Sequence, residues 1–144
     1  MATVNGTAYW ASITSPNTRF DPVYTVDLVV DEKTADGFRS KGYVVKDKEY
    51  GPTIVIKRKV NQANGKVRPA PRLVDKFNKA VDVMVGNGST VKVQYKEWES
   101  NWKGKAFQGL ELQAVQILDL VQYDAPDGSE FEVEEEDGEA IFGD

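Results

Sequence analysis

The chain has 144 residues, no cysteine or histidine, and 18 basic against 23 acidic residues, for a net charge of −5. This length predicts one domain, or one domain and a tail, and the missing cysteine excludes disulfides and thiolate metal sites. The sequence lacks a signal-peptide pattern and any apolar run near the ~20 residues of a membrane helix, so we expect an intracellular, cytoplasmic, soluble protein.

The first part of the chain predicts two strands. Residues 7–13, TAYWASI, are rich in β-formers, and residues 15–17, SPN, predict a turn after them. Residues 23–31, VYTVDLVVD, alternate apolar and polar side chains, which is typical of a half-buried strand. The apolar face of this strand is expected to hold Tyr24, Val26, Leu28 and Val30.

The middle of the chain predicts a short helix and a third strand. The helix is expected from Glu32 to Lys41, with Asp31 as its N-cap and Gly42 ending it. Residues 53–60, TIVIKRKV, predict a strand with isoleucines on one face and lysines on the other. The Asn-Gly pair at 64–65 predicts a tight turn.

The remaining body predicts a helix and two further strands. Apolar residues at helical spacing (73, 77, 81 and 84) predict a helix from Arg72 to Met84. A strand is predicted over residues 89–98, a loop over 99–105, and a long strand over 106–123. The apolar register of this last strand changes near Ala114-Val115, which predicts a bulge.

About five strands with one or two short helices, and a long, bent last strand, favour a mainly β fold. We expect a five-stranded Greek-key barrel of the OB type over residues 1–123, followed by a disordered tail over 124–144. An α+β sandwich is the alternative.

Charge is distributed unevenly along the chain. All 18 bases lie in residues 1–123 with 13 acids, which makes this part +5, whereas residues 124–144 hold ten acids and no base. The overall acidity therefore conceals a basic body joined to a polyanion.

Bases and aromatic residues are interleaved in the body. Residues 50–74 contain six bases and no acid, and residues 96–107, KEWESNWKGKAF, combine lysines with two tryptophans. A groove for single-stranded nucleic acid needs cations for phosphates and flat side chains on which bases stack. The predicted DNA-binding residues are Lys57, Arg58, Lys59, Lys66, Arg68, Arg72, Lys92, Lys96, Trp98, Trp102, Lys103 and Lys105.

The aromatic residues divide into two predicted groups. Trp98 and Trp102 have polar neighbours in the sequence, which favours exposed stacking positions over core positions. Trp10, Phe77 and Tyr95 occupy apolar or patterned positions, and we expect them in the core.

Three segments resemble a known family: RPAPRLVD, VGNGSTVKVQYKEW and GKAFQGLELQAVQILDL. They are similar to the single-stranded-DNA-binding proteins of tailed bacteriophages. Within them, the most specific elements are Pro71 to Asp75, the Gly88-Ser89 turn, and the strand from Leu112 to Leu118.

The resemblance implies an OB fold and an acidic tail that ends in or near an aromatic residue. It also implies roles in DNA replication and recombination in an infected bacterium, a polymerase or helicase as tail partner, and a possible homodimer. Phe142 is the corresponding aromatic residue, although Gly143 and Asp144 follow it. The predicted partner-binding residues are Glu134, Glu135, Glu136, Asp137, Glu139 and Phe142.

Catalysis has little support in the sequence. Without histidine and cysteine the chain lacks the commonest general base and the thiol nucleophile, and no glycine-rich phosphate loop is present. We expect a DNA-binding protein that is not an enzyme and needs no cofactor or metal. Two alternatives are an adaptor or DNA mimic acting through its tail, and a Mg²⁺-dependent nuclease using Asp27 and Asp31.

Overall fold

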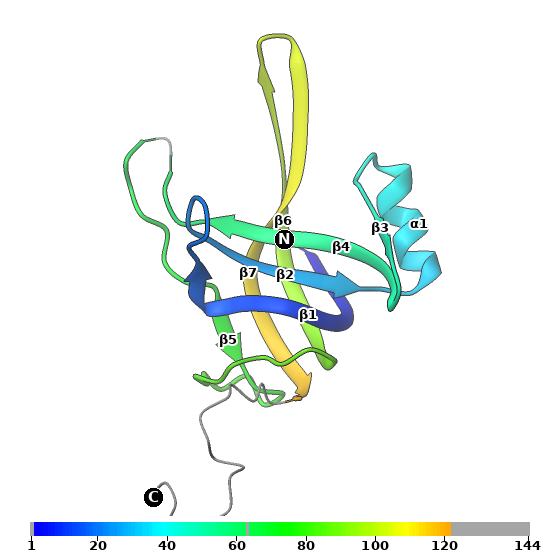
Figure 1. The fold of residues 1–144 in the computed structure, drawn as a ribbon, viewed down its shortest axis with the longest axis vertical. Coiled ribbons are helices and arrows are strands. Elements are labelled where there is room, and N and C mark those ends of the chain that lie inside the picture. The colour runs from blue at the N-terminus through cyan, green and yellow to red at the C-terminus, as the bar shows by residue number, and fades with distance from the viewer. Residues whose placement is uncertain (1, 63, 122–144) are drawn as a thin grey trace, which may run out of the picture.

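The computed structural model describes residues 2–62 and 64–121, and the tail, residues 124–144, lies outside them. The described part contains seven strands and one helix (Figure 1). In chain order they are β1 (Ala2–Asn17), β2 (Val23–Val29), α1 (Glu32–Ser40), β3 (Lys46–Lys48), β4 (Gly51–Lys59), β5 (Arg72–Val74), β6 (Ser89–Trp102) and β7 (Lys105–Asp119). In the part of the chain that the structure describes, no helix is long and apolar enough to cross a membrane.

Five of the strands close into a barrel in the order β1-β2-β4-β7-β6, with β6 returning to β1. Four of the pairings are antiparallel, and a parallel pairing of Lys57 with Glu111 closes the barrel between β4 and β7. The short strands β3 and β5 extend the sheet at its edges. This is the predicted small barrel of the OB type.

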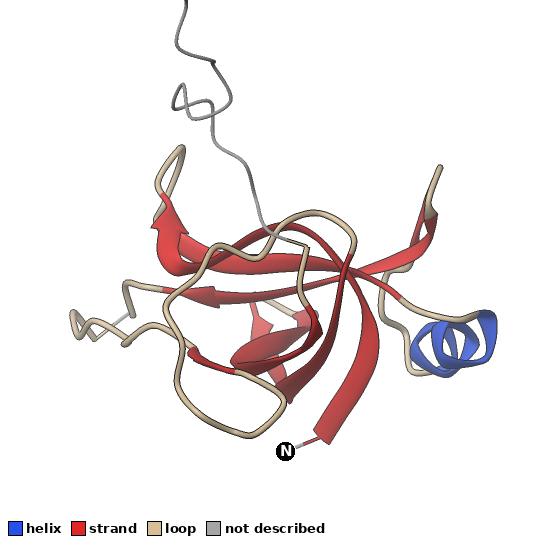
Figure 2. Cartoon of the chain, turned by 90° about the horizontal axis from the view of Figure 1, so that it is seen from below, coloured by secondary structure: helices blue, strands red, loops and turns tan. Residues whose placement is uncertain are grey.

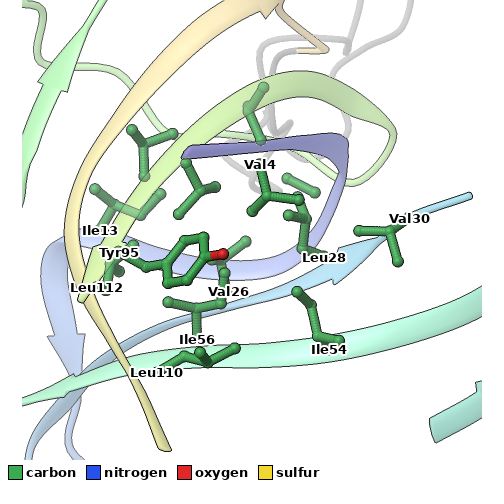
Figure 3. Packing of buried hydrophobic residues seen from close by; sticks show 14 of the residues in the cluster. Val4, Ile13, Val26, Leu28, Val30, Ile54, Ile56, Tyr95, Leu110 and Leu112 are labelled. Carbon is green, nitrogen blue, oxygen red and sulfur yellow. The ribbon is translucent and has the colours of Figure 1, made fainter. Parts of the chain in front are cut away.

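Alternating side chains fill the barrel (Figure 3). Val26 and Leu28 of β2 are fully buried, as are Val91 and Val93 of β6, and Tyr95 continues this inward row. The predicted faces of these strands and the predicted core position of Tyr95 are therefore confirmed. Removing one of these large apolar side chains would cost about 2–5 kcal/mol of unfolding free energy.

The predicted bend in the last strand is also present. Leu112 pairs with Tyr95 and Ala114 with Gln94, so Gln113 is an extra residue in β7. The inward positions change from Leu112 to Val115 across this bulge. The bulge keeps apolar side chains on the inside of a strongly curved strand.

Helix α1 begins and ends close to its predicted positions. The Asp31 carboxylate accepts a hydrogen bond from the Thr34 N–H at 2.7 Å, a cap that contributes about 0.5–2 kcal/mol. Ala35 and Phe38 are buried, and the Phe38 ring lies 5.9 Å from that of Tyr95. The helix therefore lies at the side of the barrel (Figure 2), and Arg39 in its last turn lies 3.7 Å from Asp47 of β3.

The predicted helix from Arg72 to Met84 is wrong. Leu73 pairs with Val115 of β7, which draws this segment into the sheet as β5. The next residues turn, because the Asp75 carboxylate accepts hydrogen bonds from the N–H groups of Phe77 and Lys79 at 2.8 and 3.0 Å. Such local bonds compete with a helix. Phe77 is consequently 71% exposed and does not belong to the core.

The predicted loop over residues 99–105 is mostly strand. β6 continues to Trp102, and only Lys103 and Gly104 form the turn, with φ of 50° and 79°. Two positive φ values in succession are typical of a two-residue hairpin whose twist matches the strands. The result is a long β6–β7 arm that projects from the barrel (Figure 1).

β1 is longer than predicted and continues through the expected turn at residues 15–17. Its first half pairs with β6 and its second half with β2, with a bulge between Tyr9 and Ser12. Trp10 lies in this bulge at a φ of 52°, and its N–H donates a hydrogen bond to Asn87 Oδ1 at 2.8 Å. The bulge interrupts the alternation, so Trp10 is exposed and the prediction of a core position was wrong.

Candidate nucleic-acid interface

A hollow of about 360 Å³ lies on the outside of the barrel where β4, β6 and β7 meet. We call it the basic groove. Of the six described residues that line it, five belong to the predicted DNA-binding set, and these five come from β4, from the segment that follows β4, and from β6. The lining residues are Lys57, Lys59, Arg68, Lys96, Trp98 and Glu111.

Strand geometry explains how these cations come together. Ile54 and Ile56 of β4 are buried, so the alternate residues Lys57 and Lys59 point outward. Glu111 of β7 pairs with Lys57 on one side and with Lys96 of β6 on the other. Closing the barrel therefore places two lysines from separate strands on either side of one carboxylate.

Glu111 was not predicted as part of the site. Its side chain is 20% exposed, and its carboxylate lies 3.0 Å from Arg68 Nε and 3.9 Å from Arg58 Nη1. Arg68 also donates a hydrogen bond to the Lys59 carbonyl at 3.2 Å. The carboxylate thus anchors Arg68 over the groove and neutralises one of four cations, which leaves an excess of positive charge.

Arg58 lies apart from the groove lining, although it was predicted with its two lysine neighbours. Its Nε donates to the Pro69 carbonyl at 3.0 Å, and its Nη1 donates to the Leu112 carbonyl at 3.4 Å. These bonds fasten the loop after β4 to the barrel. The side chain is largely covered, so it is poorly placed to contact a phosphate.

Trp98 lines the groove with its ring partly open. It is 41% exposed and pairs across the arm with Gly109. A Cβ on Gly109 would come within 2.6 Å of the indole atom Cζ2, so the ring lies over the backbone of β7, where a larger residue would displace it. A flat ring supported on one side and open on the other is suited to stack a base.

The end of the arm carries the other predicted residues of this segment. Trp102 is 63% exposed, and the Lys103 ammonium lies 4.5 Å from the centre of its ring. Lys105 pairs with Trp102 across the turn. Trp102 lies four positions after Trp98 along the strand, or about 13 Å away, so the arm extends the row of exposed rings away from the barrel.

The other predicted cations lie outside the basic groove. Lys66 is exposed in the turn that follows β4. Arg72 and Lys92 line a second hollow, of about 530 Å³, on the outer faces of β5, β6 and β7. We call it the amide cavity.

The loop between β1 and β2 holds an aromatic residue that sequence reasoning missed. Phe20 is 83% exposed, and the Arg19 guanidinium lies 5.7 Å from the centre of its ring. The loop adjoins the end of β4, because the Val60 N–H donates to the Pro22 carbonyl at 3.1 Å. An aromatic residue beside a base in this loop was the available signal, since OB barrels bind ligands with the corresponding loop.

A cluster of polar side chains joins the arm to helix α1. The Tyr43 hydroxyl donates to Glu97 of β6 at 2.8 Å, and Lys41 Nζ lies 3.4 Å from the same carboxylate. Gln108 of β7 donates to the Lys41 carbonyl at 3.1 Å. Burial, with a contribution from Glu97, raises the pKa of Tyr43 to about 12, and the Tyr43 hydrogen bond, followed by Lys41, lowers the pKa of Glu97.

The magnesium alternative gains no support from this geometry. The Asp31 carboxylate is the cap of α1, and its hydrogen bonds with Thr34 lower its pKa. Burial raises the pKa of Asp27. In residues 2–62 and 64–121, no three histidine, cysteine or carboxylate side chains gather in a metal-binding arrangement. The predicted partner-binding residues, from Glu134 to Phe142, lie outside the described residues.

No protein-family model and no curated protein sequence matches this chain. Solved structures of similar fold include gp2.5, a single-stranded DNA-binding protein encoded by bacteriophage T7, with a TM-score of 0.59, 19% identity, and coverage of 93% of this chain and 97% of that chain. The single-stranded DNA-binding protein of bacteriophage Enc34, in complex with ssDNA, matches with a TM-score of 0.57, 13% identity and 88% coverage of each chain. At these identities the likeness concerns the fold: the described residues share the barrel of phage single-stranded DNA-binding proteins.

Proposed function

We propose that this chain binds single-stranded DNA without sequence preference and acts in phage DNA replication and recombination, in the cytoplasm of an infected bacterium. The basic groove carries the proposal, because it places the cations of β4 and β6 beside the open ring of Trp98. The names of the structural neighbours agree with it, since they are phage proteins that bind single-stranded DNA.

Binding in this groove follows from two physical effects. Lys57, Lys59 and Lys96 replace the counterions of successive phosphates, and the released ions favour the complex. Trp98, and Trp102 further along the arm, stack on bases that lack a partner strand. A base in a duplex is already stacked and paired, so the rings favour single strands. Neither effect requires a cofactor or a chemical step.

The acidic tail has a regulatory part in this proposal. A segment of charge −10 tethered to a body of charge +5 meets the basic groove at a local concentration in about the millimolar range. The tail therefore competes with DNA for the groove, within one chain or across a homodimer. DNA displaces it and frees Phe142 and the surrounding acids for a polymerase or helicase.

A salt titration with single-stranded and duplex oligonucleotides tests the proposal. We expect tighter binding to the single strand, and a log–log salt slope of about −0.7 for each phosphate contacted. Equal affinity for duplex, or a slope near zero, would refute it. Tail-dependent capture of proteins without any DNA binding would instead support an adaptor.

A further inference from the structure

The amide cavity differs in chemistry from the basic groove. Among the described residues that line it, two are cations, Arg72 and Lys92, and none is a carboxylate. Most of its other polar side chains are amides, which both donate and accept hydrogen bonds. The amide residues are Asn78, Gln94, Gln113 and Gln116.

The two hollows adjoin along both strands of the arm's base. On the outward face of β6, Gln94 lines the cavity and Lys96 lines the groove, two residues or about 7 Å apart. On β7, Gln113 of the cavity donates a hydrogen bond to Glu111 of the groove at 2.8 Å. A nucleic-acid strand that leaves the groove along β6 therefore reaches the cavity within about one nucleotide.

Part of the cavity wall is held rigidly. Gln116 Nε2 lies 3.4 and 3.3 Å from the carbonyls of Asp75 and Lys76, and Arg72 Nη2 lies 3.4 Å from the Asn78 carbonyl. The Gln116 bonds fasten the turn after β5 to β7, and the Arg72 bond holds this turn to β5.

Other polar groups of the cavity remain open. Within the described part of the chain, no hydrogen bond or ion pair involves the side chains of Lys92 and Gln94. Donors and acceptors that face a hollow without a protein partner are available to a ligand.

The turn that carries Asn78 of the cavity also carries an exposed aromatic ring. Phe77 precedes Asn78 in the turn, and the Asp75 carboxylate fixes its backbone N–H at 2.8 Å. The Lys76 ammonium lies 5.6 Å from the centre of the Phe77 ring. The turn thus holds an aromatic ring and a cation next to the cavity, the same combination that the arm presents beside the groove.

We propose that the amide cavity is a second subsite for the same DNA strand, occupied by the nucleotides that leave the basic groove. Lys92 and Arg72 contact phosphate, the open amide of Gln94 bonds to the edge of a base, and Phe77 offers a ring for stacking. The inference rests on the proposed function, and it predicts that the length of the DNA decides whether the cavity contributes.

The test measures the affinity of the full chain for oligo-dT of increasing length, from about 4 to about 16 nucleotides, the range of OB-fold site sizes. The subsite variant is Lys92→Gln with Gln94→Ala, and Gln94→Ala alone serves if the double variant unfolds. The groove variant is Lys57→Gln, and Lys33→Gln, on an exposed face of α1, is the matched charge control.

We expect the subsite variant to bind the shortest oligonucleotides like the wild type and the longer ones about fivefold more weakly. The groove variant should weaken binding at every length, and the control at none. Equal weakening of the subsite variant at all lengths, or no weakening at any length, would overturn the subsite. If the wild type bound no oligonucleotide, the proposed function itself would fail, which is a separate result.

Discussion

The basic groove and the amide cavity share β6 and β7 but are built for different contacts. The groove places four cations around one carboxylate, and the ring that lines it, Trp98, lies over a glycine. The cavity has two cations, several amides and a ring on a neighbouring turn. Charge dominates the first and hydrogen bonding the second. Two positions only two residues apart on the outer face of β6, Gln94 and Lys96, therefore belong to sites of different chemistry.

Removing charge from the groove should produce the largest effect. We expect Lys57→Gln, Lys59→Gln and Lys96→Gln together to weaken single-stranded-DNA binding by about a hundredfold at low salt, and to reduce the salt slope by roughly 2, at about 0.7 per phosphate. Fluorescence anisotropy over a range of salt concentrations measures both. An unchanged slope would mean that the groove is not where phosphates bind, and the contrast with the cavity would disappear.

Trp98→Ala should have the next largest effect. Loss of one stacked base costs about 1–3 kcal/mol of binding free energy and leaves the fold intact, because the ring lies outside the barrel. Quenching of tryptophan emission by DNA should decrease in the same variant. Gly109→Ala is the matched probe: its methyl group displaces the indole without removing it, so it should weaken binding too. If Trp98→Ala unfolds the protein, the ring has a structural role instead.

Truncation after residue 123 tests whether the tail competes with DNA for the basic groove. If the tail occupies the groove, its removal should strengthen DNA binding several-fold, most at low salt, where charges act over longer distances. Phe142→Ala, which keeps every charge, should leave DNA binding unchanged but weaken capture of a replication partner. The competition model would be lost if the truncated and full chains had equal affinity at every salt concentration.

Glu111→Gln should shift binding and stability in opposite directions. Loss of the carboxylate raises the positive charge of the groove, so DNA binding should strengthen about two- to fivefold at low salt. Arg68 and Arg58 lose their partner, so unfolding free energy should fall by about 1 kcal/mol. Isothermal titration and denaturant unfolding give the two values. Weaker binding would show that Glu111 matters more for holding Arg68 than for its charge.

The smallest expected effect concerns the cluster that joins α1 to the arm. The pKa of Glu97 is lowered in the fold, so its contribution to stability is present above its unfolded pKa of about 4.3 and is lost as pH falls through its lower, folded value. The pKa of Tyr43 is raised to about 12, so its contribution is present below about 10 and is lost as pH rises toward 12. Thermal unfolding across pH should show both losses. Tyr43→Phe should remove the alkaline loss and reduce the acidic one, whereas Glu97→Gln should remove the acidic loss and reduce the alkaline one, because each group contributes to the pKa shift of the other.

Some features could be predicted from the sequence because they depend on local chemistry. Period-two alternation predicted the inward faces of β2, β4 and β6, since successive strand residues point to opposite sides. Asp31 predicted the start of α1 because a short carboxylate reaches a free N–H three residues ahead. The acid-free run over residues 50–74 predicted Lys57, Lys59 and Arg68 of the basic groove. The polar sequence neighbours of Trp98 predicted that its ring is exposed.

Tertiary structure decided the rest, because it depends on partners that are distant in the sequence. Leu73 had helical spacing with Phe77, but pairing with β7 placed it in a strand and left the ring exposed. A bulge turned Trp10 outward, and only closure of the barrel brought Lys57 and Lys96 to opposite sides of Glu111. The division of the predicted cations between groove and cavity has the same origin. A sequence records which side chains are available, whereas strand register determines which of them meet.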